Sequence, residues 1–323
     1  MARRLRSASV PRAAVWDLGS SSFQVLVCDS PGCNQLKPVI RRRASLNLGM
    51  AVGATGSIPA ERVTASLAAA KRLRRAVEDV RPDVVVALAT AALRDAANGR
   101  EVVARLERVV GKKVRVLDGE EEARLCFGGQ RAGVWTGPGL TLGLDLGGGS
   151  FEVAVGTRDR IDYATSTAVG ATRLRGELGA PPRLGEPERD EIRRRTTEAL
   201  VEVRRGLGRF AEVTRRTVVS GGTARALARL ATAHTREHDS TGPADVNQVE
   251  LPAAQVEELA GRLALLDLKE RLALPGMSPR RAPMIPIGAA ILAVIAAELK
   301  VERFVVSVWG LREGALLDAL SRR

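Results

Sequence analysis

Aromatic residues are scarce in this chain of 323 residues: they make up 3% of it, while apolar residues make up 45%. The hydrophobic cores must therefore be built from Leu, Val, Ile and Ala rather than from rings. Proteins that hold single-stranded nucleic acid stack its bases on aromatic side chains. The shortage of rings therefore counts against a specific nucleic-acid partner.

Cysteines and long apolar runs are also few. The three cysteines, Cys28, Cys33 and Cys126, form no CxxC pair, so neither a zinc site nor a redox pair is expected. The longest apolar stretch, at 285–299, is interrupted by Pro and Gly and is too short to span a bilayer. The basic first residues lack the continuous apolar core of a signal peptide. We therefore expect a cytoplasmic protein with no membrane partner.

Positive charge is in excess. Lys and Arg number 50 against 37 for Asp and Glu, which leaves a formal charge of +13. This excess favours a polyanionic partner, and charge alone fits nucleic acid, polyphosphate, a phosphorylated nucleotide or an acidic membrane. Arginines gather at 41–43, 72–75 and 193–195, and each cluster taken singly is typical of a solvated face.

The length suggests two domains, and the order of elements indicates an α/β fold. Apolar residues at three-to-four spacing predict an amphipathic helix over 61–80, and the apolar run 84–89 is typical of a buried parallel strand. A similar order begins again at residue 140, which indicates a weak internal duplication. This second half is expected to hold one long helix over 186–210 and a polar loop over 234–248.

The duplication is clearest at WDLGSSSF (16–23) and LDLGGGSFE (144–152). In each, an Asp ends an apolar strand, a Gly stands two residues later, and small residues lead into a second strand. Glycine lets backbone N–H groups approach an anion, and an Asp at a strand end can hold Mg²⁺ directly or through water. The alternative is a pair of plain β-hairpins. The phosphate-binding candidates are Ser20, Ser21, Ser22, Gly148, Gly149 and Ser150, and the first metal candidates are Asp17 and Asp145.

Paired turns of this kind are similar to those of the actin, hexokinase and Hsp70 superfamily. Within it, DLGSSSFQVLV and LDLGGGSFEV resemble the loops of the exopolyphosphatase and guanosine pentaphosphate phosphohydrolase (Ppx/GppA) family. Further segments match this family, or for the last of them the wider superfamily: ALATAALRDAANG (87–99), DGEEEARLCFGG (118–129), WGLREG (309–314) and VVSGGTARAL (218–227). The chain looks like the short actinobacterial form, without the C-terminal HD-type region of longer relatives.

The resemblance implies an α/β fold of two actin-like, ribonuclease-H-like domains with the ligand in a cleft between them. The first domain is expected over 1–126 and the second over 127–302. A C-terminal helix, at about 303–323, is expected to pack back on the first domain.

The resemblance also implies roles for single residues. Glu122 in GEEEARL matches the catalytic base, while its neighbours Glu120 and Glu121 are equally explained by the helix dipole. Arg94 matches an arginine that faces the bound phosphate, although an ordinary surface arginine is the alternative. Glu152 joins the metal candidates, with a solvated strand residue as its alternative, and Thr90 would donate a further hydroxyl bond.

Two features leave alternatives open. The SGGT turn, with Gly221 and Gly222, either holds an anion or a nucleoside, as in kinases of the superfamily, or only packs a helix on the sheet. Ser21 stands where many relatives have Asn, and Phe151 where Thr or Ser is common. These departures keep a non-catalytic regulator that binds polyphosphate or an alarmone among the candidates.

The function implied is exopolyphosphatase, a hydrolase that releases orthophosphate from the end of inorganic polyphosphate with Mg²⁺. Mn²⁺ and a monovalent cation stay open as cofactors, and so does a homodimer. The alternative within the same class is hydrolysis of the alarmone pppGpp to ppGpp in the stringent response.

Overall fold

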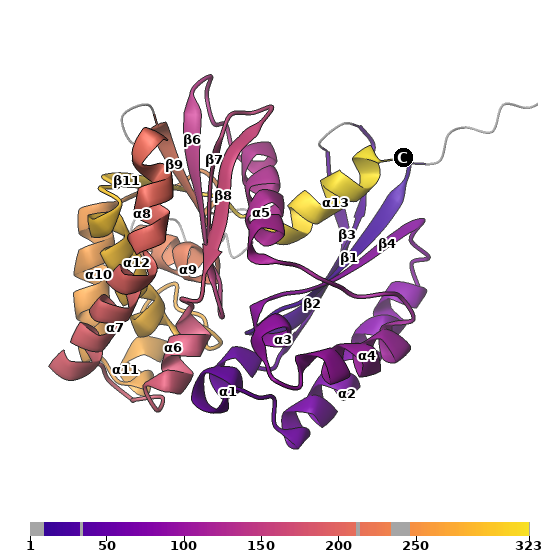
Figure 1. The fold of residues 1–323 in the computed structure, drawn as a ribbon, viewed down its shortest axis with the longest axis horizontal. Helices are drawn as coiled ribbons and strands as arrows, with labels where there is room; N and C mark the ends of the chain where they lie inside the picture. The colour runs from indigo at the N-terminus through magenta and orange to yellow at the C-terminus, as the bar shows by residue number, and fades with distance from the viewer. Residues whose placement is uncertain (1–9, 33–34, 211–213, 234–245, 323) are drawn as a thin grey trace, which may run out of the picture.

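The computed structural model describes residues 10–32, 35–210, 214–233 and 246–322. Most of the loop expected at 234–248 lies outside these residues, as does Cys33. Two mixed β-sheets stand side by side, each with helices packed against it (Figure 1). No described helix combines the length and the apolar character needed to cross a membrane.

The first sheet has the strand order β3-β2-β1-β4-β5. Its strands are β1 (Arg12–Leu18), β2 (Ser22–Asp29), β3 (Lys37–Ser45), β4 (Val84–Ala89) and β5 (Arg115–Val116). Its helices are α1 (Leu48–Thr55), α2 (Ala60–Glu78), α3 (Ala91–Asp95) and α4 (Gly99–Val110). Strands β1 to β3 run antiparallel to one another, whereas β4 runs parallel to β1 and β5 parallel to β4. This is the ribonuclease-H-like arrangement that the sequence predicts.

The second sheet repeats the same order, β8-β7-β6-β9-β11, and adds β10 at its edge. Its strands are β6 (Leu140–Leu146), β7 (Phe151–Gly156), β8 (Ile161–Thr167), β9 (Thr214–Gly221), β10 (Glu250–Pro252) and β11 (Arg303–Val306). Its helices are α6 (Ala171–Glu177), α7 (Glu186–Ala199), α8 (Val201–Leu207), α9 (Gly222–Thr232), α10 (Ala253–Leu265), α11 (Leu268–Leu272) and α12 (Ile285–Glu298). The matching strand order supports the internal duplication inferred from the sequence.

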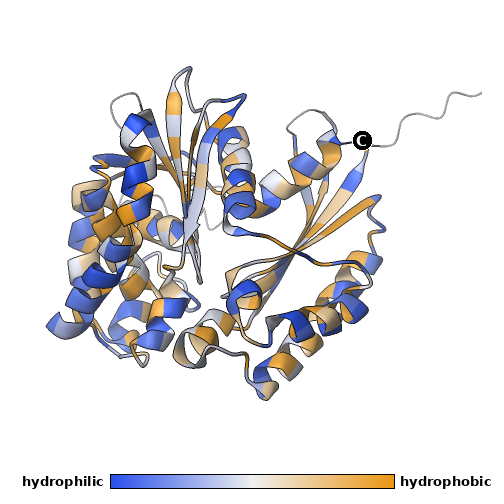
Figure 2. Cartoon of the chain, in the orientation of Figure 1, coloured by the Kyte–Doolittle hydropathy of each residue, from blue (hydrophilic) through white to orange (hydrophobic). Residues whose placement is uncertain are grey.

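Burial follows the sequence pattern in both lobes. In α4, for example, Val102, Leu106 and Val110 recur at helical spacing and are buried in the first core. Figure 2 shows hydrophobic residues along the strands and hydrophilic residues on the outer sides of the helices. Each sheet therefore has a core of its own, built almost entirely from aliphatic side chains.

The single helix expected over 186–210 is divided in the structure: α7 and α8 meet at Leu200, and the segment ends in the 3₁₀ turn Gly208–Phe210. Helix α7 packs on α12, while α8 packs on β8. Gly206 makes the second contact close, since a Cβ there would lie 2.2 Å from the Tyr163 hydroxyl.

Two helices occupy the junction of the lobes: α5 (Gly119–Gly133), which connects them, and α13 (Leu311–Ser321), which ends the described chain (Figure 1). Helix α13 packs on α5 and on strands β1 and β4 of the first sheet. Glycine permits this crossing, because a Cβ at Gly314 would lie 1.9 Å from the Leu125 carbonyl oxygen. Strand β11 belongs to the second sheet, so the return to the first lobe begins with α13.

Candidate active site

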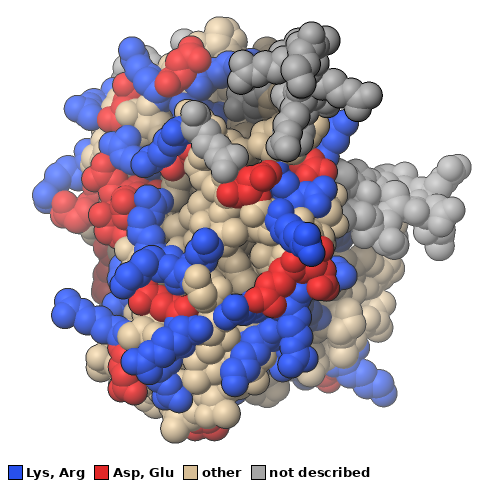
Figure 3. Space-filling model, turned by 90° about the vertical axis from the view of Figure 1, so that its right-hand side faces the viewer, with Lys and Arg blue, Asp and Glu red and all other residues tan. Residues whose placement is uncertain are grey.

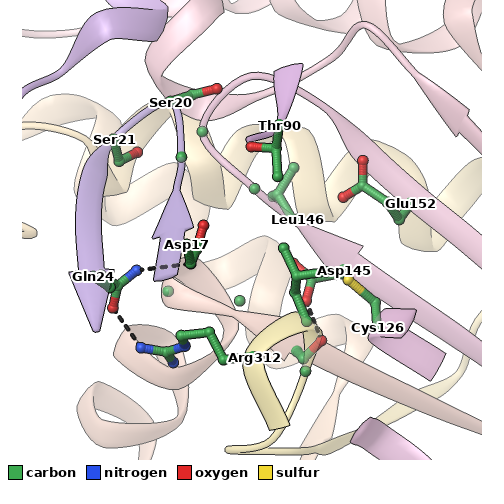
Figure 4. A pocket seen from close by; sticks show the side chains of 18 of the residues that line it. Asp17, Ser20, Ser21, Gln24, Thr90, Cys126, Asp145, Leu146, Glu152 and Arg312 are labelled. Atoms are coloured by element: carbon green, nitrogen blue, oxygen red, sulfur yellow. Dashed lines mark hydrogen bonds between the residues drawn. The ribbon is translucent and has the colours of Figure 1, made fainter. Parts of the chain in front are cut away.

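A cleft between the two lobes collects the glycine-rich turns of both sheets (Figure 4). Its walls include these sequence-predicted residues: Asp17, Ser20, Ser21, Ser22, Thr90, Glu122, Asp145, Gly148, Gly149, Ser150, Glu152, Gly221 and Gly222. Arg94 is the one candidate that does not line the cleft directly. The sequence motifs, which are far apart in the chain, therefore converge on one site.

The two predicted phosphate loops lie against each other. A Cβ at Gly148 would stand 2.2 Å from the Ser21 Oγ, and a Cβ at Gly149 would stand 2.3 Å from the Ser20 Oγ. The Ser20 Oγ accepts a hydrogen bond of 3.1 Å from the Ala92 N–H, while the Ser21 hydroxyl bonds to that of Thr172 at 2.7 Å. Glycine at 148 and 149 is thus required for the turns of the two lobes to meet.

Each hairpin has a pair of polar residues facing each other across its two strands, but the residue types differ between the hairpins. In the second hairpin, Asp145 and Glu152 are direct cross-strand partners. In the first, the partner of Asp17 is Gln24, whose amide donates to the Asp17 Oδ2 at 3.3 Å. Like charges directly opposite each other destabilise a sheet. The second hairpin therefore carries a repulsive pair of carboxyls, whereas in the first hairpin the neutral amide of Gln24 takes the place of the second carboxyl.

The buried carboxyls of the cleft have raised pKa values. Burial raises the pKa of Glu152 to about 7, and repulsion from Asp145 adds to it, while hydroxyls of Ser150 and Ser166 oppose the change. Burial also raises the pKa of Asp17 to about 6, against the attraction of Arg312 and Arg43. Loss of contact with water is thus the main reason that these carboxyls hold their protons more tightly than exposed ones.

Glu122 lies in the first turn of α5 and is buried. Its Oε2 accepts a 3.0 Å bond from Arg94, whose guanidinium also donates to the Leu117 carbonyl at 3.0 Å. Burial raises the pKa of Glu122 well above its usual value and Glu152 adds to this, whereas Arg94 lowers it. Arg94 thus fixes the position of the Glu122 carboxylate.

The two neighbours of Glu122 have structural partners. Glu120 pairs with Arg124 at 2.8 Å, and Glu121 forms a reciprocal capping box with Asp118 at the start of α5. Of the three consecutive glutamates, only Glu122 faces the cleft. The helix-start interpretation therefore accounts for Glu120 and Glu121 but not for Glu122, which faces the cleft.

The cleft is also lined by four arginines that the sequence analysis did not identify as site residues: Arg43, Arg225, Arg281 and Arg312. We refer to them as the arginine wall. Arg225 donates to the Gly221 carbonyl at 3.1 Å and Arg312 to the Gln24 side chain, while the buried Arg43 Nε has no partner. Within the part of the chain that the structure describes, no ion pair joins any of the four to a carboxylate.

Crowding of like charges is visible in the wall. Burial and, after it, the repulsion of neighbouring arginines lower the pKa of Arg43 and of Arg225 to about 10. A desolvated guanidinium group without an ion-pair partner is costly, and an anion that pairs with it relieves this cost. The wall, drawn from β3, α9, α13 and the segment before α12, therefore favours an anionic ligand.

Arg281 bears on which ligand the SGGT turn could hold. A Cβ at Gly222 would lie 1.7 Å from the Arg281 Nη2, so the guanidinium rests directly on this glycine. Gly221 has a φ of 101°, which favours glycine, and it connects β9 to α9. The arginine fills the space over the turn, an arrangement that favours phosphate over a nucleoside there.

The donor set of the cleft is also suited to a hard cation. Among the described residues, no three or more His, Cys, Asp or Glu side chains are clustered closely enough to hold a metal ion on their own. Mg²⁺ does not need such a cage, because it takes one or two carboxylates and completes its shell with water and substrate phosphate. The facing pair Asp145 and Glu152 supplies oxygen ligands of this kind.

Known proteins resemble this chain along nearly its whole length. The family model described as the Ppx/GppA phosphatase family matches residues 27–323. Exopolyphosphatase 1 of Mycobacterium tuberculosis is 30% identical over 314 residues, which cover 96% of this chain and 88% of that protein.

Solved structures share the fold. The crystal structure of an exopolyphosphatase from Cytophaga hutchinsonii has a TM-score of 0.85 at 24% identity, covering 95% of this chain and 98% of that one. The Aquifex aeolicus member of the Ppx/GppA family has a TM-score of 0.75 at 25% identity, covering 97% and 98%.

Proposed function

The chain belongs to the Ppx/GppA phosphatase family, and on this premise we propose that it is an exopolyphosphatase that hydrolyses the terminal phosphate of inorganic polyphosphate in the cleft. The observation that carries the proposal is the arginine wall, which faces buried carboxylates across one cavity. A linear polyanion fits both, with its terminal phosphate beside Glu122 and the phosphates behind it along the arginines.

The loops provide donors for the terminal phosphate. Hydroxyl and backbone N–H groups of Ser20–Ser22 and Gly148–Ser150 lie at the meeting point of the two hairpins, close to Thr90. Donors that are already in place stabilise the charge on a transferring phosphoryl group, because no reorganisation is needed during the reaction. These loops therefore hold the phosphate that is removed.

Glu122 is the base in this account. A water oxygen attacks the terminal phosphorus and forms a new P–O bond, while the bond from this phosphorus to the bridging oxygen breaks. The bridging oxygen leaves with the shortened chain, and a proton of the water passes to Glu122. A base works best with a pKa near the working pH, and burial raises the pKa of Glu122 in that direction.

We further propose that Asp145 and Glu152 hold Mg²⁺, with Asp17 facing them as a third oxygen donor. The bound cation would neutralise charge on the phosphate oxygens. Mn²⁺ would suit the same oxygen donors, because carboxylate and water also suit this ion.

The test is orthophosphate release from long-chain polyphosphate and from guanosine pentaphosphate, each with Mg²⁺ and with excess chelator. We expect metal-dependent release, with a higher kcat/KM for polyphosphate, because Arg281 covers the turn at Gly222. A preference for guanosine pentaphosphate would assign the alternative activity. Binding of both compounds without any release would identify a regulator instead of an enzyme.

A further inference from the structure

We propose that a second groove, separate from the catalytic cleft, binds a nucleotide. Such a ligand combines an anionic phosphate group with a planar base, and a sugar links the two. The groove is lined by α5, by α13, by the turn between β7 and β8, and by the segment around Trp135. Its volume is about 600 Å³, within the range of roughly 300–1,000 Å³ that is usual for small-molecule sites. The exopolyphosphatase assignment does not use this groove.

Two guanidinium groups supply the phosphate-binding half. Arg131 Nη1 is buried without a hydrogen-bond partner, and the Arg131 Cζ lies over the Phe127 ring, 6.0 Å from its centroid. Arg158, on the β7–β8 turn, is exposed and makes no ion pair with any described carboxylate. A guanidinium that is desolvated but unpaired favours an anionic partner.

Most of the other charged side chains in the groove already form ion pairs. Arg124 pairs with Glu120 at 2.8 Å, and Asp318 pairs with Arg322 at 3.0 Å. Asp159, which is exposed on the same turn, is the acidic group that attracts Arg131. Among the described residues that line the groove, Asp159 is then the one carboxylate without an ion-pair partner, against the two arginines Arg131 and Arg158. This balance leaves the groove able to accept a phosphate.

Trp135 supplies the surface for the ring. Its side chain is 65% exposed, although its backbone is anchored by a bond from its N–H to Gln248 and a bond to its carbonyl from Arg216. The Arg216 guanidinium lies 5.2 Å from the indole centroid. The exposed indole offers a large apolar surface for stacking, and it lines the same groove as Arg131 and Arg158.

The position of the groove connects it to both lobes. Helix α5 packs on strands of the second sheet and α13 on strands of the first, and both also reach the catalytic cleft through Glu122 and Arg312. Gly128 faces open space, because a Cβ there would have no neighbour within 4 Å. A ligand here would therefore touch the two helices that join the lobes (Figure 1).

The experiment uses adenosine 5′-monophosphate and guanosine 5′-monophosphate, which contain no phosphoanhydride bond to hydrolyse. We expect saturable quenching of tryptophan fluorescence, with loss of the quenching in Trp135→Phe. Arg131→Gln and Arg158→Gln should each weaken binding at least about tenfold, since a bond to a charged group is worth about 1.5–3 kcal/mol. The exposed Arg158 provides a variant whose folding is not in question.

Three controls make the outcome decisive. Arg225→Gln, in the catalytic cleft, should leave the dissociation constant unchanged, and inorganic phosphate or adenosine alone should bind at least about tenfold more weakly than the whole nucleotide. The proposal is overturned by quenching that survives both groove variants, by quenching lost in Arg225→Gln, or by no saturation up to 10 mM. Phosphate alone binding as tightly as the nucleotide would also overturn it. None of these results bears on polyphosphate hydrolysis.

Discussion

Glu122 and Arg94 form the pair on which the proposed chemistry depends. The sequence could predict both, because GEEEARL and TAALRDA carry a specific resemblance. Their contact could not be predicted, because they come from α5 and α3 and meet only in the folded chain. At this scale the structure adds that Arg94 holds the carboxylate of Glu122.

Replacing Glu122 with Gln should lower the turnover of polyphosphate by about 10² to 10⁴, the usual contribution of a general base. The amide retains the shape and can still accept a bond from Arg94, so polyphosphate binding should remain. Steady-state phosphate release and equilibrium binding together check this. Glu120→Gln is the matched control, because Glu120 pairs with Arg124 outside the cleft. A Glu122 variant with more than a third of the turnover would remove the residue from the mechanism.

Arg281 should affect substrate binding more than chemistry. Arg281→Ala removes one guanidinium of the arginine wall, so the KM for polyphosphate should rise about tenfold while kcat changes little, since a charged hydrogen bond is worth about 1.5–3 kcal/mol. Arg280→Ala is the control, because that side chain is exposed and does not line the cleft. An equal effect of the two variants on KM would show that only the overall charge matters.

The paired hairpins are the elements that the sequence predicts best, because an Asp at a strand end followed by a glycine turn is a local pattern. Strand β3 was missed because its residues are mostly exposed and pairing with β2 holds it in place. The arginine wall was missed for a related reason. Each of its members comes from a different element, and no short pattern unites them.

The two hairpins should respond differently to the same substitution. Asp145→Asn should raise the Mg²⁺ concentration for half-maximal activity well above the value for Asp17→Asn. The reason is that Asp145 faces the carboxylate Glu152, whereas Asp17 faces the neutral amide of Gln24. Activity measured against free Mg²⁺ for both variants checks this. If Asp17→Asn proves the more sensitive variant, the metal is assigned to the wrong hairpin.

Over the whole molecule, much of the positive charge is already paired on the surface. Arg194 bonds Glu191 and Glu198 at 2.6 and 2.7 Å, and Arg74 bonds Glu78 at 2.6 Å. Figure 3 shows Lys and Arg side chains intermingled with Asp and Glu on the face that lies to the right in Figure 1. Of the three arginine clusters noted in the sequence, only 41–43 supplies a residue to the cleft.

The raised carboxyl pKa values predict how stability depends on pH. Asp17 and Glu152, with pKa values of about 6 and about 7, hold their protons to higher pH in the folded protein than when unfolded. The folded protein thus binds more protons between about pH 4 and pH 7, and its stability without divalent cation should fall as pH rises through this window.

Mg²⁺ should oppose this loss, because it binds the ionised carboxylates of the folded state only. Thermal unfolding at pH 5 and pH 8, with and without Mg²⁺, measures the effect apart from activity. The melting temperature should increase with Mg²⁺ at pH 8 and change little at pH 5. An equal increase at both pH values would mean that these carboxyls do not bind the ion.

The central claim is that this cleft removes phosphate from the end of a polyphosphate chain. The most direct measurement resolves the products formed from polyphosphate of a single defined length, with Mg²⁺, as the reaction proceeds. The account predicts orthophosphate as the only small product and chains shortened one phosphate at a time, with both formed about 10² to 10⁴ times more slowly by Glu122→Gln. Internal fragments, or orthophosphate release that persists at full rate in the Glu122 variant, would contradict it.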